Sequence, residues 1–187
     1  SNQIVVLNSD ETEACDPYWL PVNEPMECDS FTVTLKDENF DIDFVMRDFL
    51  LQSIDEDYEF NCRMISTCYW PDSCSPIRTA FELIDKVRLY RAQAMASSVM
   101  APTASTSHNA PSIIVHDLSG GFRAGAFCAL YTFQDLVNLE STVNVYEVAK
   151  LFHLKRPGIW QNQSNLMFLY KAVECLFGEL HLRPKKS

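Results

Sequence analysis

The chain has 187 residues, of which 47% are hydrophobic and 21% are charged. This composition excludes an intrinsically disordered chain, and the length is sufficient for one globular domain with its own core. The formal net charge is −10, and the only basic cluster is the short tail 183–186. A surface that binds nucleic acid is therefore excluded, and binding to an anionic membrane is disfavoured.

Seven cysteines are present at irregular spacings, without a C-x-x-C pair. This pattern argues against a zinc ribbon or a thioredoxin-like site and fits a reducing compartment. Residues 1–20 lack a basic segment followed by an apolar one, and no apolar run has the length needed to cross a bilayer. We expect the chain as it stands to be soluble, with membrane association only through a larger parent protein.

The first third of the chain predicts strands. Short apolar or alternating runs are separated by polar segments, which is typical of an antiparallel meander. A loop is expected at 8–30 because this segment is rich in Asp, Glu, Pro and Asn, and a turn is expected at 37–39. The predicted strands are 4–7, 31–35, 40–51 and 59–69.

The rest of the chain predicts helices around one more strand. Ser75-Pro76 is expected to begin a helix that ends near residue 95, since Ser is a good cap and Pro fits the first helical position. Residues 96–111 are small and polar and predict a flexible internal loop. The run 112–116 is typical of a central parallel strand, and the final helices are predicted at about 124–139, 143–155 and 163–177. The order of elements predicts an α/β fold with a twisted mixed sheet flanked by helices.

A glycine-containing loop connects the strand at 112–116 to the next helix. The backbone N–H groups of such a loop and the helix N-terminus can both face an anion. The residues are His116-Asp117-Leu118-Ser119-Gly120-Gly121-Phe122-Arg123-Ala124-Gly125.

This segment resembles the phosphate loop of protein tyrosine phosphatases, which reads His-Cys-x-x-Gly-x-x-Arg-Ser/Thr-Gly. Gly120, Arg123 and Gly125 match the phosphate-binding positions, whereas Asp117 replaces the nucleophilic cysteine and Ala124 replaces the hydroxyl residue. Further segments resemble the family in the correct order. Trp70-Pro71-Asp72 is similar to the general-acid loop, and Arg156-Pro157-Gly158-Ile159-Trp160-Gln161 is similar to the loop that presents a water-positioning glutamine, with Asn165 in place of a second glutamine.

The resemblance is greatest to the membrane-distal second domain of receptor-type tyrosine phosphatases of the gamma/zeta type. It implies that residues 1–187 are a single, partial domain of this family that lacks the N-terminal part. The family reaction needs no cofactor, and no metal ligands are evident around Asp117. The parent protein is expected to be a receptor phosphatase, which would place this chain on the cytoplasmic side of the plasma membrane.

The substitutions predict a loss of catalysis. A carboxylate is not a soft nucleophile, and Asp117 would repel a phosphate dianion. Phe122 stands where the family usually has glycine, and a bulky residue there conflicts with a positive φ unless Gly121 shifts the loop path. Asp117, Asp72 and Gln161 are therefore interpreted as vestigial catalytic positions, and the phosphate positions as vestigial too.

Three functions remain open from the sequence. The favoured one is an inactive domain that scaffolds or regulates an adjacent phosphatase domain or a signalling protein, with Arg123 paired to Asp117. The second is a module that binds a phosphotyrosine protein without hydrolysing it. The third is a residual enzyme that uses Asp117 as a nucleophile, which would need a metal ion.

Overall fold

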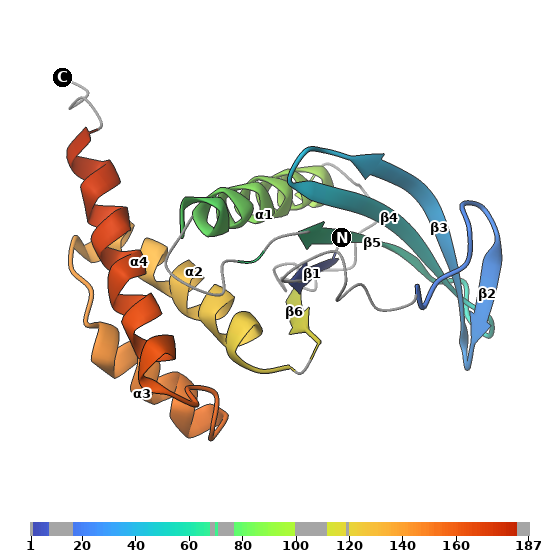
Figure 1. Ribbon diagram of the computed structural model, residues 1–187. Helices are drawn as coiled ribbons and strands as arrows, with labels where there is room; N and C mark the ends of the chain where they lie inside the picture. Colours follow the sequence, from blue (N-terminus) through green and yellow to red (C-terminus); the bar gives the residue numbers. More distant parts are fainter. Residues whose placement is uncertain are drawn as a thin grey trace. The chain divides into compact units, whose positions relative to one another are not determined.

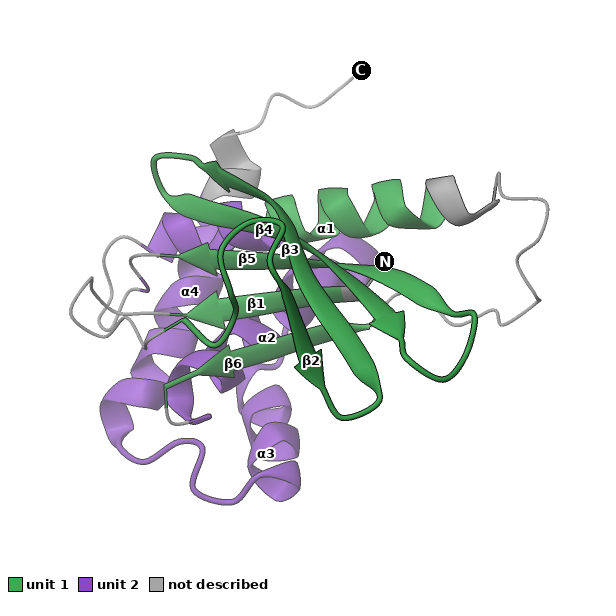
Figure 2. Cartoon of the chain, turned by 90° about the vertical axis from the view of Figure 1, so that its right-hand side faces the viewer, with its two compact units in different colours: residues 1–69, 85–118 green, residues 70–84, 119–187 purple. Residues whose placement is uncertain are grey.

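The computed structural model describes residues 2–7, 17–67, 70, 77–99, 112–118 and 120–182. The chain divides into two compact units (Figure 2). The first contains residues 1–69 and 85–118, and the second contains residues 70–84 and 119–187. Helix α1, Ile77–Val99, contributes to both units, because the division falls between Ile84 and Asp85. Each unit is described by itself below.

The first unit is built on a six-stranded mixed sheet (Figure 1). The strand order is β2-β3-β4-β5-β1-β6, with antiparallel pairing from β2 to β5 and parallel pairing of β1 with both β5 and β6. The mixed sheet and the meander predicted from the sequence are confirmed. The strands are β1 Asn2–Leu7, β2 Pro25–Cys28, β3 Phe31–Phe40, β4 Phe44–Ser53, β5 Glu59–Thr67 and β6 Ile113–Asp117.

The alternation of side chains along the strands gives the sheet two different faces. One face carries a hydrophobic cluster whose buried members are Leu35, Phe49, Cys62 and Met64. The other face carries Gln3, Met46 and Arg63, which contact the part of α1 that belongs to this unit. Both faces therefore combine apolar and polar side chains, since Arg47 lies opposite Met64 in the register of β4 and β5, on the same face as the cluster.

Two predictions about this region were wrong. Strand β2 lies within the predicted loop 8–30, and it pairs with β3 although its four residues include only one hydrophobic side chain that is partly buried. The predicted turn at 37–39 is strand instead, because β3 continues past a register shift between Leu35 and Asp37. Its polar residues are accommodated by pairing across to β4, where the Arg47 Nε donates to Glu38 at 2.6 Å. The turn lies at 41–43.

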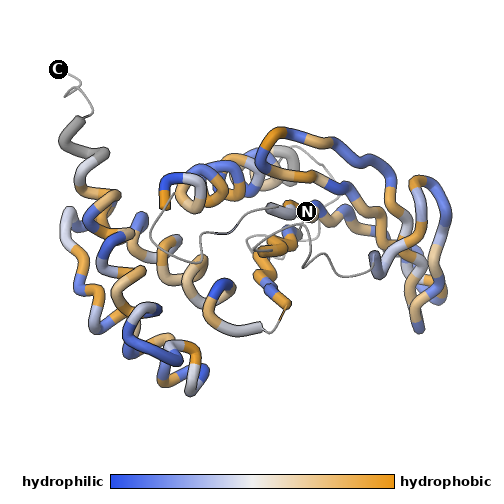
Figure 3. The backbone as a smooth tube through the Cα atoms, in the orientation of Figure 1, coloured by the Kyte–Doolittle hydropathy of each residue, from blue (hydrophilic) through white to orange (hydrophobic). Residues whose placement is uncertain are grey.

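Strand β6 is parallel to β1, as predicted, but it is the last strand of the described sheet and not a central one. Its hydrophobic residues colour most of the strand orange in Figure 3. Ile114 is 57% exposed, so the apolar run that suggested a central strand is only partly buried. The strand ends at Asp117, where the candidate loop begins.

Helix α1 is held to the sheet of the first unit by polar contacts. With its side-chain amide turned to satisfy both neighbours, Gln3 donates to the Val87 carbonyl at 3.2 Å and accepts from the Arg91 N–H at 2.9 Å. Lys86 pairs with Asp41 and lies over the Phe44 ring, 4.4 Å from its centroid. The helix ends at Val99, beyond the predicted residue 95, so the first four residues of the predicted loop 96–111 are helical and the rest lie outside the described residues.

The second unit contains the end of the chain as helices α2 Phe122–Glu140, α3 Val145–Lys155 and α4 Gln163–Leu182. All three predicted helices are confirmed, with small differences at their ends. Asn144 caps α3, since its side chain accepts from the Glu147 N–H at 3.2 Å. The core of this unit contains Phe127, Phe133 and Phe168, each at most 1% exposed. No helix in the described part of the chain is long and apolar enough to cross a membrane.

The ion pair between Lys86 and Asp41 makes the stability of the first unit depend on pH. The pKa of Asp41 lies below its ordinary value because the carboxylate accepts hydrogen bonds from Lys86 and from the Ile42 N–H. A carboxyl group whose pKa is lower in the folded state stabilises that state above the unfolded pKa, and this contribution disappears as the pH falls through the folded pKa.

We therefore expect the wild type to be more stable than Asp41→Asn at neutral pH. The difference should shrink to nothing as the pH falls through the lowered pKa, below the ordinary value of 3.8. Urea unfolding between neutral pH and acid measures it. Asp43→Asn is the matched control on the same turn, because Asp43 forms no ion pair with any residue that the structure describes. A difference for Asp41→Asn that stays constant with pH would contradict the prediction.

Candidate functional site

The segment after β6 has the strand-loop-helix arrangement predicted from the sequence. Asp117 ends β6 with only 8% of its surface exposed. Gly120 has a φ of +61°, and Gly121 is the N-cap of α2 without a side-chain capping bond. The first turn of α2 contains no acidic residue, so the only charge in this segment that would oppose an anion is that of Asp117.

The expected site residues fall in different parts of the structure. Asp117 belongs to the first unit, whereas Gly120, Arg123 and Gly125 belong to the second. Gln161 belongs to the second unit and is exposed. Asp72, the expected general acid, lies outside the described residues, and the ion pair expected between Arg123 and Asp117 stays a prediction.

His116, next to Asp117, contacts a residue that the sequence did not indicate. The Tyr18 hydroxyl lies 3.3 Å from the His116 Nε2. Tyr18 stacks edge-on against Trp19, which lies under the Arg47 guanidinium at 4.7 Å and against the Phe49 ring. The only sequence signal for this contact is the aromatic pair within an otherwise polar segment. The segment around residue 18 therefore contacts the end of β6 from which the loop begins.

Phe122 does not strain the loop, which corrects the steric expectation. The positive φ of this segment is taken by Gly120, and Phe122 is the first residue of α2. Its ring packs edge-on against Trp160 at 6.1 Å and Phe168 at 5.5 Å between centroids. The side chain that was expected to disturb the loop therefore joins the core of the second unit.

Gly125 was expected at a phosphate-binding position, and the structure gives it a packing role. A Cβ at this position would lie 2.2 Å from the Ile159 Cδ1 and 2.7 Å from the Ile159 Cγ1. Real Cβ atoms do not approach other carbons so closely, so the contact requires glycine. Gly125 thus allows the 156–160 loop to pack directly on the first turn of α2.

The 156–160 loop is also fixed to the other helices of this unit. The Trp160 indole N–H donates to the Ala149 carbonyl in α3 at 2.8 Å. Asn165, in place of the family's second glutamine, accepts from the backbone N–H groups of Gln161 at 3.0 Å and Asn162 at 3.3 Å. In return, the Asn162 side chain accepts from the Asn165 N–H at 3.0 Å. This reciprocal arrangement caps the start of α4.

Two thiols of the described residues, Cys62 and Cys128, are poorly suited to act as nucleophiles. Burial raises the pKa of Cys128 in α2, and burial likewise raises the pKa of Cys62 in β5. A raised pKa keeps a thiol protonated and unreactive at neutral pH. Within the described ranges, no three His, Cys, Asp or Glu side chains are grouped so as to hold a metal ion.

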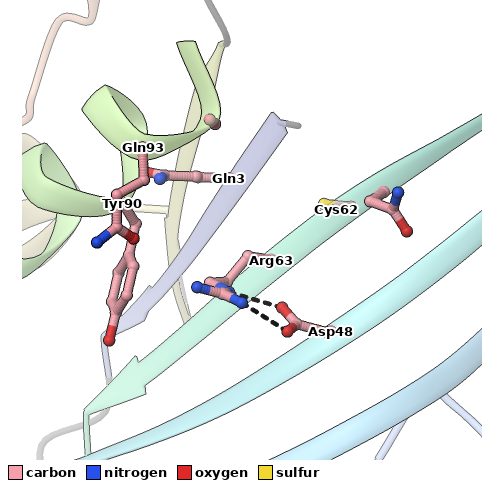
Figure 4. Close-up of a pocket in the computed structure, with 8 residues that line it drawn as sticks. Gln3, Asp48, Cys62, Arg63, Tyr90 and Gln93 are labelled. Atoms are coloured by element: carbon pink, nitrogen blue, oxygen red, sulfur yellow. Dashed lines mark hydrogen bonds and ion pairs between the residues drawn. The ribbon is translucent and has the colours of Figure 1, made fainter. Parts of the chain in front are cut away.

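A separate hollow of about 330 Å³ lies between the sheet and α1 in the first unit (Figure 4). Arg63 and Asp48 form two hydrogen bonds across its wall, each of 2.6 Å, and the Arg63 guanidinium lies 4.7 Å from the centre of the Tyr90 ring. The Asp48 carboxylate raises the pKa of Arg63. The principal charges of the hollow are therefore already paired with one another, and none of its lining residues belongs to the 116–125 loop.

Comparison with known proteins gives consistent matches. The family model of the protein-tyrosine phosphatase domain matches residues 1–175. The chain is 34% identical over 182 residues to human receptor-type tyrosine-protein phosphatase zeta, covering 93% of this chain and 7% of that protein. It is 33% identical over 179 residues to mosPTP-1 of Culex quinquefasciatus, named as a receptor-type tyrosine-protein phosphatase, covering 96% of this chain and 11% of that protein.

A third relative is tyrosine-protein phosphatase 99A of Drosophila melanogaster, which is 31% identical over 184 residues, covering 98% of this chain and 13% of that protein. The chain thus spans roughly a tenth of the length of these relatives, between 7% and 13%.

The contact between Gly125 and Ile159 can be tested by mutation. Gly125→Ala should destabilise the chain by about 1–3 kcal/mol, because the new methyl group overlaps the Ile159 side chain. Ile159→Ala removes the overlapping atoms, so the double variant should lose less stability than the sum of the two single variants. Urea unfolding gives all three values.

Gly178→Ala in α4 is the matched control, since a Cβ there would meet nothing within 4 Å. Alanine favours a helix over glycine by about 1 kcal/mol, so this variant should be neutral or stabilising. Equal effects of Gly125→Ala and Gly178→Ala would disprove the packing role of Gly125.

Proposed function

Since the chain belongs to the protein-tyrosine phosphatase family over residues 1–175, we propose that it is a catalytically inactive second phosphatase domain of a receptor-type protein. In this proposal it regulates or scaffolds an adjacent active phosphatase domain or a signalling partner, on the cytoplasmic side of the plasma membrane. The observation that supports the proposal is Asp117, which ends β6 and which, by resemblance to the family motif, occupies the position of the nucleophilic cysteine. The receptor-type relatives support the expected context.

The chemistry of the family explains why this one residue matters. In the reaction that the resemblance to the family implies, a thiolate attacks phosphorus, an arginine binds the phosphoryl oxygens and an aspartic acid protonates the leaving phenol. An oxygen carboxylate at position 117 adds a negative charge where a phosphate dianion would enter, and it lacks the polarisable sulfur. Ala124 also removes the hydroxyl group that assists breakdown of the phosphoenzyme.

The surrounding residues do not replace what is lost. The Cys128 thiol in α2 has a raised pKa because it is buried, so it supplies no thiolate near neutral pH. A carboxylate nucleophile of the acyl-phosphate type typically works with a divalent metal ion, and no group of possible metal ligands is found within the described ranges. These two observations favour an inactive domain over a residual enzyme.

Turnover of an aryl phosphate tests the proposal directly. We expect no hydrolysis above background from the wild type, because no nucleophile is in place. Asp117→Cys combined with Ala124→Thr should gain measurable activity. Phe122 is left unchanged in this variant because its ring packs against Trp160 and Phe168.

Arg123→Ala supplies the control in both backgrounds. It should abolish whatever activity the restored variant gains, because the arginine is the expected phosphoryl ligand. Hydrolysis by the wild type that disappears in Arg123→Ala would refute the inactive-domain proposal. Activity in the presence of a divalent metal, together with a trapped acyl phosphate on Asp117, would support the residual enzyme instead.

A phosphotyrosine-binding module is the second candidate, and one observation favours it. Gly120 keeps a positive φ and Gly121 leaves the start of α2 without a side-chain cap, which is the backbone arrangement that anions prefer. Asp117 opposes such binding by charge repulsion, so we expect calorimetry with a phosphotyrosine peptide to show no binding to the wild type or to Arg123→Ala. Micromolar binding that is lost in Arg123→Ala would make the domain a phosphotyrosine reader.

A further inference from the structure

Tyr58 lies at the end of the hairpin that connects β4 to β5. Its side chain is 56% exposed, and it precedes the first residue of β5 in non-helical backbone. The backbone is held by hydrogen bonds from the Tyr58 N–H to the Glu56 carbonyl at 2.8 Å and from the Ser53 N–H to the Tyr58 carbonyl at 2.9 Å. Its ring contacts Phe60 at 5.8 Å between centroids. Within the described part of the chain, no hydrogen bond holds the Tyr58 hydroxyl.

The hairpin carries four exposed carboxylates within three residues of Tyr58 in the sequence. The exposed carboxylates are Asp55, Glu56, Asp57 and Glu59. From Asp48 to Cys62 the sequence contains no lysine or arginine. Glu59 makes one hydrogen bond in this region, accepting from the Gln52 Nε2 at 3.3 Å. The segment therefore presents a tyrosine within an acidic loop, and the nearest arginines of the two strands, Arg47 and Arg63, are paired with Glu38 and Asp48.

The other described tyrosines are less suited to reaction at the hydroxyl. Tyr146 and Tyr170 are exposed but lie inside α3 and α4, so an enzyme cleft could receive them only after the helix unwinds. Tyr18 is exposed, but its hydroxyl contacts a histidine ring nitrogen at 3.3 Å. Tyr90 and Tyr131 are only partly exposed.

From this placement we propose that Tyr58 is a phosphorylation site for a tyrosine kinase with a basic substrate groove. The Tyr58 hydroxyl oxygen attacks the γ-phosphorus of MgATP, the new O–P bond forms as the bond to the bridging oxygen of ADP breaks, and the phenolic proton passes to the base of the kinase. Charge complementarity between an acidic segment and a basic groove selects this tyrosine over the others. The phosphate then adds roughly two negative charges at pH 7 beside four carboxylates.

Phosphorylation in this position loosens the hairpin rather than ordering it. A phosphate beside Asp and Glu side chains acts by like-charge repulsion, since no arginine or lysine of the two strand ends is available to bind it. The hairpin end is fixed by the Ser53–Tyr58 bond and by the Ile54 N–H, which donates to the Ser30 carbonyl at 2.9 Å. The modified chain should therefore unfold at a lower temperature than the unmodified one.

The test is phosphorylation of the folded chain with MgATP and a purified kinase domain that phosphorylates the peptide 52–62. Sites are located by mass spectrometry, and rates are measured below the unfolding temperature. Tyr58→Phe should lose most of the incorporated phosphate while keeping the ring contact with Phe60. Tyr146→Phe is the matched control, an exposed tyrosine followed by a glutamate, and it should keep the wild-type rate.

A second variant, in which the acidic side chains next to Tyr58 are neutralised, tests the role of charge. Replacing Asp55 and Asp57 with asparagine and Glu56 with glutamine should lower kcat/KM for Tyr58 by about tenfold, because the electrostatic attraction is removed. The proposal is overturned if the peptide is phosphorylated but the folded chain is not, or if Tyr58→Phe leaves incorporation unchanged. The assay involves no residue of the 116–125 loop, so its outcome is independent of whether the domain is inactive.

Discussion

The close approach of Ile159 to Gly125 is the constraint on which the second unit depends. The loop 156–160 can lie against the first turn of α2 only because residue 125 has no Cβ. The same loop donates a hydrogen bond to α3 through Trp160, and the Trp160 ring faces Phe122. The reciprocal Asn162 and Asn165 cap follows directly and begins α4. One glycine thus lets a single loop connect three helices.

A residue of the phosphate-loop motif can be required either for anion binding or for packing, and Gly125 is an example of the second case. A glycine in a phosphate loop is usually explained by the close approach of an anion to the backbone. At Gly125 the approaching atoms are those of Ile159, so the residue is required by packing whether or not an anion binds. Phe122 gives the complementary case, because a residue that departs from the family pattern is accommodated in the core between two aromatic rings.

The sequence predicted the helices and most of the strands well, because their apolar residues recur at regular spacings and because capping and turn residues mark their ends. The helices α2, α3 and α4 have apolar residues at helical spacing and recognisable starts, and the strands of the meander alternate in part, with a register shift in β3. Strand β2 was missed because its residues are mostly exposed, so its pairing with β3 leaves no pattern in the sequence. The false turn at 37–39 arose because Glu38 and its neighbours look like loop residues, whereas Glu38 is satisfied by Arg47 on the adjacent strand. An ion pair between neighbouring strands cannot be recognised from a short stretch of sequence around Glu38 alone.

The candidate site was predictable where it rests on a linear motif and not where it rests on tertiary contacts. The order from His116 to Gly125 predicted a loop that opens into α2, but α2 begins at Phe122, two residues earlier than expected, and the positive φ lies at Gly120, a position that the sequence did not indicate. The contact of Tyr18 with His116 joins residues 98 positions apart, and no spacing rule links them. In the sequence, Asn165 is noticed only because it replaces the glutamine that the family motif has there. In the structure, the Asn165 side chain accepts hydrogen bonds from two backbone N–H groups. Gly125 and Asn165 therefore hold the helices of the second unit together whether or not the loop performs any chemistry.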